Sequence, residues 1–316
     1  MSKITNQLII EKAKEAGFDL IGFSRSEKLT DEVNNLRIWL REKKNGGMEY
    51  MENNLDKRED VTLILPDAKS VISLAVNYYT PYYQSSKKGY GKISRYAWGE
   101  DYHIHIWKML ELLESNLAKI DNKFKSKSYV DTGPVMDRVW AERSGIGWRG
   151  KNGNIITKEF GSWVFIATII TNYEFDYDFP KPDACGTCTA CIEACPTKAI
   201  VSPGVVDSNR CISYLTIENK GSIPDSFSNQ FNNWLFGCDI CQDVCPWNKK
   251  FAKPTNKKYF EPTIGTEIKL DFFEQLSNRK FNKIFNDSPI KRARAKGMRR
   301  NADFLKKENF KNETNC

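Results

Sequence analysis

The sequence predicts a mixed α+β chain in three consecutive parts: an α/β domain over residues 1–178, a cysteine-rich domain over residues 179–250, and a basic helical segment over residues 251–316. Three observations support this division. Helical and strand patterns alternate along the first part, which is typical of helices packed on a sheet. Eight of the nine cysteines lie between residues 185 and 245. Lys and Arg are concentrated after residue 248.

The elements of the first part follow from hydrophobic periodicity and from turn residues. The predicted helices are 3–16, 31–43 and 101–120, and the predicted strands are 19–24, 71–79, 128–131 and 163–171. Gly17 is expected to end the first helix, and Gly46 and Gly47 to end the second. Residues 82–91 are polar and contain Gly and Ser, which predicts a loop.

The cysteines form two runs, and each run ends in Cys-Pro. The first is Cys185-x2-Cys188-x2-Cys191-x3-Cys195-Pro196, and the second is Cys238-x2-Cys241-x3-Cys245-Pro246 with Cys211 upstream of it. This spacing is typical of bacterial ferredoxins that hold two 4Fe–4S clusters. It predicts that residues 179–250 carry electrons one at a time in a loop-rich domain held together by metal.

In such runs the cysteine before each proline usually ligates the other cluster. This rule predicts Cys185, Cys188, Cys191 and Cys245 as ligands of the first cluster. It predicts Cys195, Cys211, Cys238 and Cys241 as ligands of the second. Disulfides and zinc are the alternatives, but zinc needs only two Cys-x2-Cys pairs and explains neither the additional cysteine nor the Cys-Pro of each run.

Charge is unevenly distributed along the chain. Residues 249–316 hold 18 Lys or Arg against 8 Asp or Glu, whereas the rest holds 30 against 32. A basic segment beside a redox domain favours a polyanionic partner, with nucleic acid as the leading choice. A solvated helix face is the alternative interpretation. The sequence contains no run of 18 apolar residues, so it predicts no membrane span. Because the cysteines are expected to be reduced and no export signal is found, we expect a cytoplasmic protein.

Other cofactor motifs are missing from the sequence. Residues 145–150 match the letters of a dinucleotide-binding fingerprint only loosely, and they lie between a predicted helix and a strand, which is the wrong order. There is no P-loop, and with only His103 and His105 a histidine-based metal site or relay is not expected. The Asp-x-His-x-x-Gly signature of some cobalamin enzymes is also absent.

Several longer stretches of the chain resemble the epoxyqueuosine reductases. They span residues 95–103, 130–138, 141–151, 211–218 and 237–248, for example Arg95-Tyr96-Ala97-Trp98-Gly99-Glu100-Asp101-Tyr102-His103. The resemblance implies a cobalamin-binding α/β domain similar to that of reductive dehalogenases, fused to a ferredoxin-like domain. It also implies a short helical, HEAT-like segment at the C-terminal end, and therefore a smaller contact with tRNA.

The resemblance implies a specific reaction. Epoxyqueuosine reductases remove the epoxide oxygen of epoxyqueuosine at the wobble position of tRNAs with a GUN anticodon, which gives queuosine. Electrons from an external donor pass through two 4Fe–4S clusters to base-off cobalamin, and family members suggest a monomer. One alternative is a reductive dehalogenase-like cobalamin reductase acting on a small molecule; the basic tail and the missing export signal argue against it. Another is a non-catalytic electron carrier, for which 178 residues before the clusters are excessive.

Asp131 matches the proton donor of the family. Opening an epoxide and losing its oxygen as water require protons, and a carboxylic acid can supply them when desolvation raises its pKa. The alternative is that Asp131 caps its own Asp-Thr-Gly-Pro turn. Asp137 is expected to pair with Arg138 or Arg143 instead. Contact with cofactor or substrate and orientation of a loop both stay open for His103.

The resemblance also gives candidate contacts. Those for cobalamin are Arg58, Tyr96, Ala97, Asp131, Asn154, Ile155, Ser213, Cys238, Asp239, Ile240 and Cys241. The candidate tRNA contacts are Lys220, Lys291, Arg292, Arg294, Lys296, Arg299 and Arg300, whose charges would bind phosphates. Trp234 and Trp247 are possible stacking platforms for bases, with core packing as the alternative.

Overall fold

A four-stranded sheet organises the N-terminal part of the chain. In the computed structural model, which describes residues 4–84 and 87–314, its strand order is β1–β2–β7–β4. The strands are β1 (Leu20–Arg25), β2 (Ser70–Asn77), β7 (Val164–Thr171) and β4 (Ser126–Tyr129). Every neighbouring pair is antiparallel, so the alternation of helices and strands along the sequence does not produce a parallel sheet.

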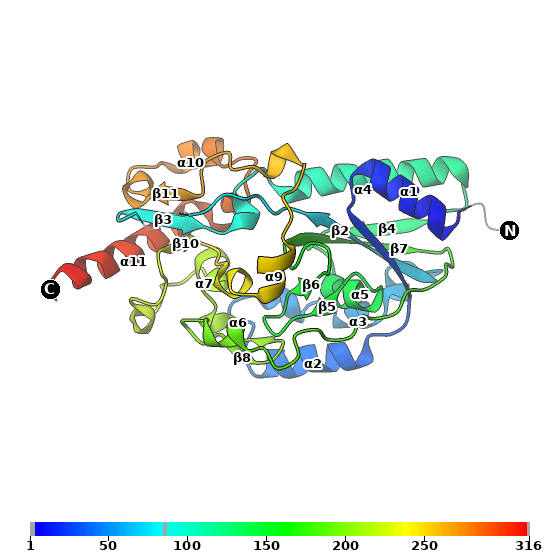
Figure 1. Ribbon diagram of the computed structural model, residues 1–316, viewed down its shortest axis with the longest axis horizontal. Helices are drawn as coiled ribbons and strands as arrows, with labels where there is room; N and C mark the ends of the chain where they lie inside the picture. Colours follow the sequence, from blue (N-terminus) through cyan, green and yellow to red (C-terminus); the bar gives the residue numbers. More distant parts are fainter. Residues whose placement is uncertain (1–3, 85–86, 315–316) are drawn as a thin grey trace.

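Helices cover both faces of this sheet (Figure 1). α1 (Asn6–Ala16) and α4 (Tyr102–Ile120) pack in one core with Ile72, Leu74 and Val76 of β2. On the other face, α2 (Thr30–Arg41) and α5 (Asp137–Arg143) pack with Val71 of the same strand, and the short α3 (Leu55–Glu59) contacts α2. Successive side chains of a strand point to opposite faces, so covering both faces buries all eight residues of β2.

A second, three-stranded sheet joins all three parts predicted from the sequence. Its order is β10–β3–β11, with β3 (Tyr90–Ile93) parallel to β10 (Trp234–Phe236) and antiparallel to β11 (Glu267–Lys269). The loop prediction was therefore wrong for residues 90 and 91, and residues 251–316 are not wholly helical. Strands of three or four residues are too short to show a period of two in the sequence.

Three helices pack against this second sheet. They are α7 (Ile212–Ile217), α10 (Asn278–Ile284) and α11 (Arg294–Thr314), and with the sheet they form a second apolar core. This core includes Phe236, Phe273 and Phe281, each with at most 1% of its surface exposed. The division into three domains and the HEAT-like character of the C-terminal segment stay predictions.

The cysteine-rich part is built from short elements, as predicted. They are α6 (Ala190–Glu193), β8 (Ile200–Ser202), β9 (Val205–Val206), α8 (Ile240–Asp243) and α9 (Pro246–Phe251), together with the neighbouring hairpin of β5 (Trp148–Arg149) and β6 (Ile155–Ile156). Figure 1 shows these elements gathered around α9, beside the larger sheet. Single 3-10 turns lie at Glu49–Glu52, Val61–Leu63, Arg95–Ala97, Ser208–Arg210, Asp225–Phe227, Lys258–Phe260, Leu270–Phe273 and Pro289–Ala293.

The ends of the long helices are set by local chemistry. The Thr5 side chain accepts a hydrogen bond from the backbone of Leu8 and caps α1, which ends at Gly17 with a φ of 108°. Asp101 caps α4 by accepting from the backbone N–H of His103. Among the described residues, no helix has the length and apolar character needed to cross a membrane.

Candidate functional site

The first group of thiols comes from the loop before α6, from α6 itself, which contains Cys191, and from the residue before α9. Cys191 lies close enough to Cys185, Cys188 and Cys245 to be affected by their charges, and burial together with these neighbours raises its pKa. Burial raises the pKa of the Cys185 thiol, and the nearby backbone N–H of Lys151 acts in the opposite direction. The structure therefore brings together the four cysteines predicted for the first cluster.

The second group joins cysteines from three separate segments. Burial raises the pKa of Cys241 strongly, and the charges of Cys211 and Cys195 contribute. Cys238 is influenced by Cys241 and Cys211 in the same way. The backbone N–H of Ala199 donates to the sulfur of Cys195 over 3.3 Å. Burial and the charge of Cys195 raise the pKa of Cys211, so Cys195 lies near the second group although it belongs to the first sequence run; the crossover itself stays a prediction.

Both groups fit iron–sulfur clusters better than single metal ions. The eight cysteines in the described part of the chain are free thiols. No three His, Cys, Asp or Glu side chains of the described residues converge on one metal ion. The four cysteine ligands of a cubane cluster bind four different iron atoms, so they surround a volume instead of meeting at a point. Because burial raises the thiol pKa values, cluster binding must displace protons from these cysteines.

A buried polar contact fixes the loop between Cys238 and Cys241. The carboxylate of Asp239, only 1% exposed, accepts hydrogen bonds from the Ser94 hydroxyl and, over 2.7 Å, from the backbone N–H of Arg95. The Arg95 guanidinium lies 4.4 Å from the ring centroid of Trp98. A cobalamin contact by Asp239 would therefore use its backbone. Sequence reasoning did not find the roles of Ser94 and Arg95, which depend on a contact spanning more than 140 residues.

Asp131 lies in the turn after β4 and is exposed to solvent. Its φ of 58° places it in the left-handed region, which is uncommon for a residue other than glycine. The hydroxyl of Tyr102 donates a hydrogen bond to the Asp131 carboxylate over 2.8 Å. Burial and the charge of Asp131 raise the pKa of Tyr102 well above its usual range, so the hydroxyl keeps its proton. Tyr102 belongs to the quoted motif, but sequence reasoning gave it no role.

His103 stacks on Tyr102, with ring centroids 4.1 Å apart. Its Nδ1 lies 2.8 Å from a carboxylate oxygen of Asp101. Its Nε2 is buried and has no partner within the described part of the chain. An unpaired buried nitrogen next to the Tyr102–Asp131 contact is compatible with a bound polar group and keeps both interpretations of His103 open.

Asp137 does not pair with the arginines expected from the sequence. Its carboxylate accepts a hydrogen bond from the Thr168 hydroxyl over 2.5 Å. Arg143 instead pairs with Glu32 at 2.9 Å, and Arg138 donates to the carbonyl of Gly153. Burial raises the pKa of Asp137 to about 7. The prediction failed because α5 turns Asp137 toward the sheet and the two arginines away from it.

The remaining cobalamin candidates fall into two groups. Arg58, Tyr96, Asn154, Ser213 and Ile240 retain some exposed surface, although Arg58 is only 8% exposed. Burial and then the charges of Asp131, Asp239 and Glu218 raise the pKa of Tyr96, which places its ring between the two groups. Ala97 is wholly buried in the second core, so the structure does not support a side-chain contact there. Ile155 is 2% exposed.

The basic candidates lie around the end of α7 and the start of α11. The side chains of Lys220, Lys291, Arg294 and Lys296 are exposed. Arg292 is exposed as well and forms a two-point ion pair with Glu218, at 2.7 and 3.1 Å.

Arg299 and Arg300 have other partners. Arg299 donates to the carbonyl of Leu276. Arg300 donates to the carbonyls of Leu215, Asn219 and Gly221, and so holds the loop that carries Lys220. Both arginines therefore have fewer donors available for phosphate than the sequence suggested.

Electrostatic contacts connect this basic region to Asp131. Burial raises the pKa of Tyr50, which precedes α3, and the charges of Glu218, Arg292 and Asp131 also act on it. The hydrogen bond to Glu218 raises the pKa of Arg292, and the charges of Tyr50 and Asp131 add to this effect. The pKa of Asp101 at the start of α4 is lowered by its hydrogen bonds with His103 and by the charge of Lys291. The Asp131 turn is thus within electrostatic range of Tyr50 and Arg292. Trp234 packs in the second core, so the core interpretation holds for it, whereas Trp247 is half-buried beside the first thiol group.

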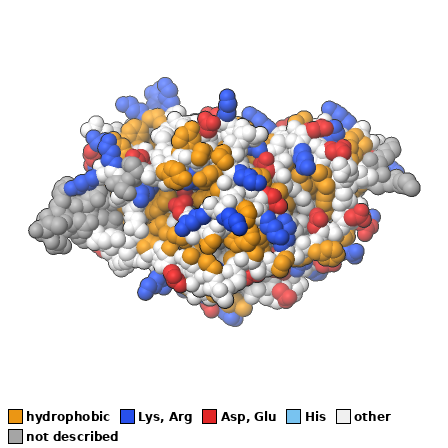
Figure 2. Space-filling model, viewed as in Figure 1, with side chains coloured by type: hydrophobic (Ala, Val, Ile, Leu, Met, Phe, Trp, Pro, Cys, Tyr) orange, Lys and Arg blue, Asp and Glu red, His pale blue; other side chains and the backbone are white. Residues whose placement is uncertain are grey.

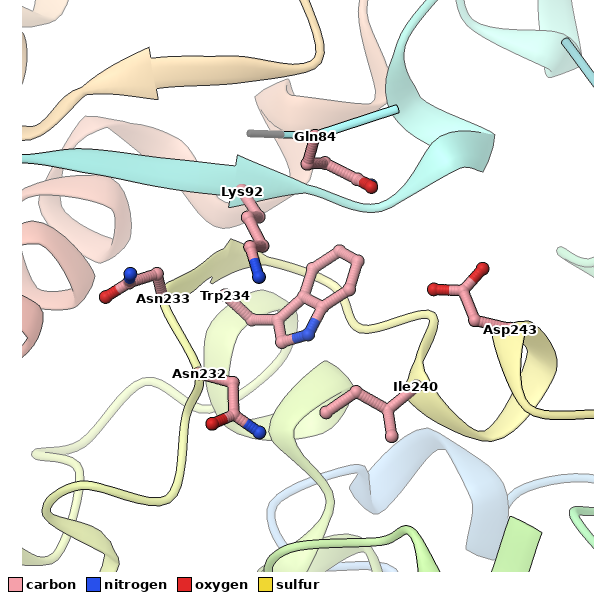
Figure 3. A pocket seen from close by; sticks show the side chains of 7 residues that line it. All are labelled: Gln84, Lys92, Asn232, Asn233, Trp234, Ile240 and Asp243. Atoms are coloured by element: carbon pink, nitrogen blue, oxygen red, sulfur yellow. The ribbon is translucent and has the colours of Figure 1, made fainter. Parts of the chain in front are cut away.

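Two further surface features lie near the cysteines. Figure 2 shows Lys and Arg side chains interleaved with hydrophobic surface over the region of α9. A separate cavity of about 390 Å³ borders α8, and in Figure 3 the Lys92 ammonium points toward the Trp234 ring. Its lining residues are Gln84, Lys92, Asn232, Asn233, Trp234, Ile240 and Asp243. Apart from Ile240 and Trp234, none of these residues was predicted to belong to a site.

Comparison with known proteins places the chain in a family. A family model described as the 4Fe-4S double cluster binding domain matches residues 184–248, and one described as epoxyqueuosine reductase QueG, DUF1730, matches residues 58–132. The epoxyqueuosine reductase of Cellulophaga algicola is 46% identical over 95% of this chain and 98% of its own length. The chain belongs to the epoxyqueuosine reductase family. The epoxyqueuosine reductase of Atelocyanobacterium thalassa is 47% identical, over 96% of this chain and 99% of its own length.

Solved epoxyqueuosine reductases share the fold. A crystal structure with an epoxyqueuosine-modified tRNA-Tyr stem loop is 38% identical, with a TM-score of 0.88 over 94% of this chain and 80% of that chain. The Streptococcus thermophilus enzyme is 32% identical, with a TM-score of 0.88 over 96% and 82%. A Bacillus subtilis structure, 37% identical with a TM-score of 0.87 over 94% and 80%, is described with its aspartate-bearing catalytic loop swung out of the active site.

These similarities decide between the hypotheses drawn from the sequence. The chain is an oxidoreductase, so the non-catalytic carrier is excluded. The double-cluster match covers all eight clustered cysteines, which confirms the prediction of iron–sulfur clusters over zinc or disulfides. The assignment of each cysteine to one cluster, and the roles of single residues, stay predictions.

Proposed function

We propose that this epoxyqueuosine reductase acts on epoxyqueuosine at the wobble position of tRNAs with a GUN anticodon and releases queuosine. The observation that carries the proposal is the Asp131 turn, where an exposed carboxylate is held by Tyr102 and lies among basic and aromatic side chains. A relative 38% identical to this chain has been solved with the modified stem loop, which supports the same substrate class here.

The cofactors of the proposal are two 4Fe–4S clusters and base-off cobalamin. When bound, the clusters supply single electrons and cobalamin supplies a strongly reducing cobalt. The first cluster would be held by Cys185, Cys188, Cys191 and Cys245, and the second by Cys195, Cys211, Cys238 and Cys241. Arg58, Tyr96, Asn154 and Ser213 would hold the corrin. Burial, and then the charges of Asp131 and Asp239, raise the pKa of Tyr96, so its ring lies within range of both the Asp131 turn and the loop of the second thiol group. The Nε2 of His103, which has no partner among the described residues, supports a polar ligand at this place.

Asp131 supplies the proton in this proposal. Removal of an epoxide oxygen as water consumes two electrons and two protons and leaves a carbon–carbon double bond. The Asp131 carboxyl is exposed and accepts a hydrogen bond from Tyr102, so it can donate a proton and be reprotonated from solvent. Tyr102 orients the carboxyl, and its raised pKa keeps it a donor of this hydrogen bond throughout.

The basic residues position the tRNA. Lys220, Lys291, Arg294 and Lys296 are exposed and would contact phosphates on either side of the anticodon loop. Arg292 can exchange Glu218 for a phosphate oxygen, because both partners bind its guanidinium in the same two-point geometry. We further propose that the protein works as a monomer in the cytoplasm with an external electron donor.

The proposal is tested with anaerobically purified protein, reconstituted with iron, sulfide and cobalamin. The protein is incubated with a reductant and epoxyqueuosine-containing tRNA, and the nucleosides are identified by mass spectrometry. We expect the wild type to remove one oxygen and Asp131→Asn to be slower by at least about 10²-fold. Asp121→Asn is the matched control, because Asp121 also accepts a tyrosine hydroxyl, that of Tyr173, but lies at the end of α4.

The outcomes separate the parts of the proposal. Equal conversion by Asp131→Asn and the wild type would contradict the proton-donor role and leave the enzyme intact. No conversion by a wild type with bound corrin and intact clusters would contradict the tRNA substrate and favour a small-molecule cobalamin reductase.

A further inference from the structure

We propose that the face around the Cys185–Cys191 loop and α9 is the docking site for a small acidic protein that carries one electron. This inference rests on the proposed function, because a reductase with clusters needs an electron source. It adds the entry point of the electrons and the chemistry of the donor.

The first thiol group reaches the surface. Cys188 is the exposed member of the eight described cysteines, and Gly186, Thr187 and Thr189 around it are exposed as well. The cysteines of the second group are all half-buried, between α7, α8 and β8. Rates of electron transfer fall steeply with distance, so a partner protein gains most by approaching the first group.

Lysines surround this loop, and side-chain contacts connect them to it. The Trp247 indole donates to the carbonyl of Ala184 over 3.1 Å, directly before Cys185. Trp247 stacks on Phe251 with ring centroids 5.0 Å apart, and the Lys250 ammonium lies 5.1 Å from the Phe251 ring. On the other side of the loop, the Lys151 ammonium donates to the carbonyl of Gly186 over 2.6 Å.

The net charge of this face is positive. Residues 145–161, 179–195 and 245–254 hold seven Lys or Arg and three Asp or Glu. Two of the three acidic side chains are bound locally, since Asp183 accepts from the backbone of Cys185 and Glu193 from the Thr189 hydroxyl. Lys249 and Lys250 are exposed, and Figure 2 shows positive side chains around α9. Such a patch attracts an acidic partner and accelerates association.

Exposed apolar surface completes the face. Phe179 is 83% exposed, more than any other large hydrophobic side chain in the described part of the chain. It is followed by the exposed Pro180 and Pro182, just before the cysteine loop. Its backbone carbonyl packs against Gly145, and the neighbouring Lys181 donates to the carbonyl of Ile146. An exposed aromatic among cations suits a transient protein interface, with apolar contact at its centre and charges at its rim.

The exchange at this face is one electron. The reduced centre of the carrier loses one electron, the cluster held by Cys185, Cys188, Cys191 and Cys245 gains it, and no bond forms or breaks. Two such encounters supply the two electrons that removal of an epoxide oxygen requires. The basic region near Asp131 comes from α7, the 3-10 turn at Pro289–Ala293 and α11, so tRNA and carrier would use separate surfaces.

The test measures reduction of the clusters without tRNA or cobalamin. Photoreduced acidic flavodoxin is mixed with the reconstituted protein, and bleaching of the clusters is followed by stopped-flow absorbance. We expect Lys249→Glu/Lys250→Glu to lower the second-order rate constant at least about tenfold at low ionic strength, with the difference shrinking at high salt. Lys280→Glu/Lys283→Glu, the same charge change on exposed side chains of α10, is expected to react like the wild type.

Three controls make the result decisive. Reduction by dithionite, which needs no docking, is expected to be the same in all variants that carry a full complement of iron. If the Glu variant loses iron, Lys249→Gln/Lys250→Gln replaces it, with a smaller decrease expected. Affinity for a tRNA stem loop is expected to be unchanged.

Equal rates for the α9 and α10 variants, or a loss of tRNA affinity in the α9 variant, would overturn the docking proposal. Normal reduction by flavodoxin followed by no conversion of tRNA would instead contradict the proposed function and leave the docking face standing.

Discussion

At the scale of single residues, the site depends on how few hydrogen bonds hold Asp131. Within the described residues, the carboxylate has one side-chain partner, Tyr102, and the backbone of Asp131 lies in the left-handed region. Such a residue is positioned by its turn and by that one hydroxyl. The sequence alone did not separate Asp131 as a proton donor from Asp131 as a turn cap, because both need a short acidic side chain before Thr-Gly-Pro.

Tyr102→Phe is expected to slow the reaction without unfolding the protein. Loss of one hydrogen bond to a carboxylate corresponds to about 1.5 kcal/mol, or roughly a tenfold lower single-turnover rate. Tyr173→Phe removes the same kind of Tyr–Asp contact far from the site and is expected to leave the rate unchanged. Rates are measured with excess enzyme over a range of pH. A Tyr102→Phe rate equal to that of Tyr173→Phe at every pH would show that Tyr102 does not position the acid.

Asp137 makes stability depend on pH. Folding raises its pKa from 3.8 to about 7, mainly through burial, so the folded state holds a proton that the unfolded state releases. The free energy of unfolding therefore decreases as pH rises through this window and levels off above about 7. The side chain introduced by Asp137→Asn cannot ionise. We therefore expect the melting temperature of the variant minus that of the wild type to increase between about pH 5 and pH 8.

The control for this prediction is Asp67→Asn, a substitution of a carboxylate that is 71% exposed. It is expected to keep a constant difference from the wild type over the same pH range. If Asp137→Asn also kept a constant difference in anaerobic thermal melts, Asp137 would titrate near its ordinary pKa in the folded protein.

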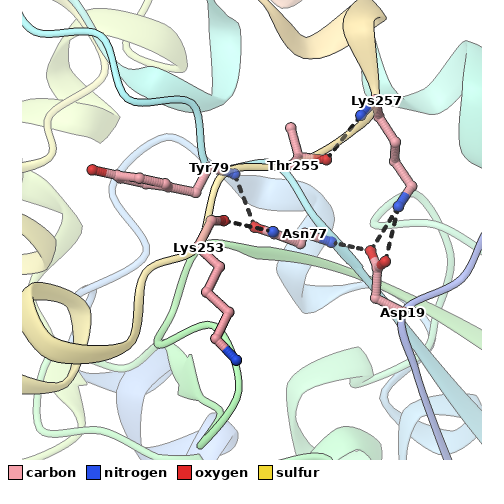
Figure 4. A network of polar contacts seen from close by, with 6 residues as sticks. All are labelled: Asp19, Asn77, Tyr79, Lys253, Thr255 and Lys257. Carbon is pink, nitrogen blue, oxygen red and sulfur yellow. Dashed lines mark hydrogen bonds and ion pairs between the residues drawn. The ribbon is translucent and has the colours of Figure 1, made fainter.

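At the scale of elements, a polar network ties the chain after α9 to the central sheet. The Lys257 ammonium lies 2.8 Å from a carboxylate oxygen of Asp19. Asn77 of β2 donates to the carbonyl of Lys253 and accepts from the backbone N–H of Tyr79 (Figure 4). This network fixes the segment that leaves the first thiol group and enters the second core. Sequence reasoning missed it because its partners are up to 238 residues apart.

Lys257→Met is expected to destabilise the protein by about 2 kcal/mol, because it leaves a partly buried carboxylate of Asp19 without its cation. The Lys257 side chain is 10% exposed, so solvent screens this pair only weakly. Lys269→Met breaks an exposed pair with Asp271 and is expected to change stability by less than about 0.5 kcal/mol. Anaerobic thermal melts compare the two; an equal effect of both substitutions would contradict a structural role for the network.

At the scale of the whole molecule, basic charge around the Asp131 turn should make tRNA binding sensitive to salt. Each phosphate contact adds about 0.7 to the slope of log affinity against log salt for single-stranded nucleic acid. Replacing Lys291, Arg294 and Lys296 together by Ala is therefore expected to lower the slope by roughly 2.

Titrations of a fluorescent anticodon stem loop at several salt concentrations measure this slope. The matched control replaces Lys119, Lys123 and Lys127, three exposed lysines of the N-terminal part, and is expected to leave the slope unchanged. Unchanged slopes for both triple variants would place the tRNA on another surface.

We expect Arg300→Ala to reduce stability as well, because the Arg300 guanidinium donates hydrogen bonds to three backbone carbonyls.

The sequence by itself determined what is encoded locally. Cysteine spacing predicted iron–sulfur clusters, since a short loop around a cubane needs cysteines at fixed offsets. Long periodic segments predicted α1, α4, β2 and β7 to within three residues, because burial of one or both faces leaves a regular pattern. The family resemblance indicated the reaction class, and the comparisons confirmed the family.

Only the tertiary structure decided how distant segments meet. It showed that the sheet is antiparallel, that β3, β10 and β11 form a second sheet, and that Ala97 is buried within the second core. It showed that Asp137 pairs with Thr168 and that Arg300 holds the loop that carries Lys220. These contacts depend on packing between residues far apart in the chain. Periodicity and spacing are local properties of the sequence, so they do not predict which distant residues form a buried polar pair.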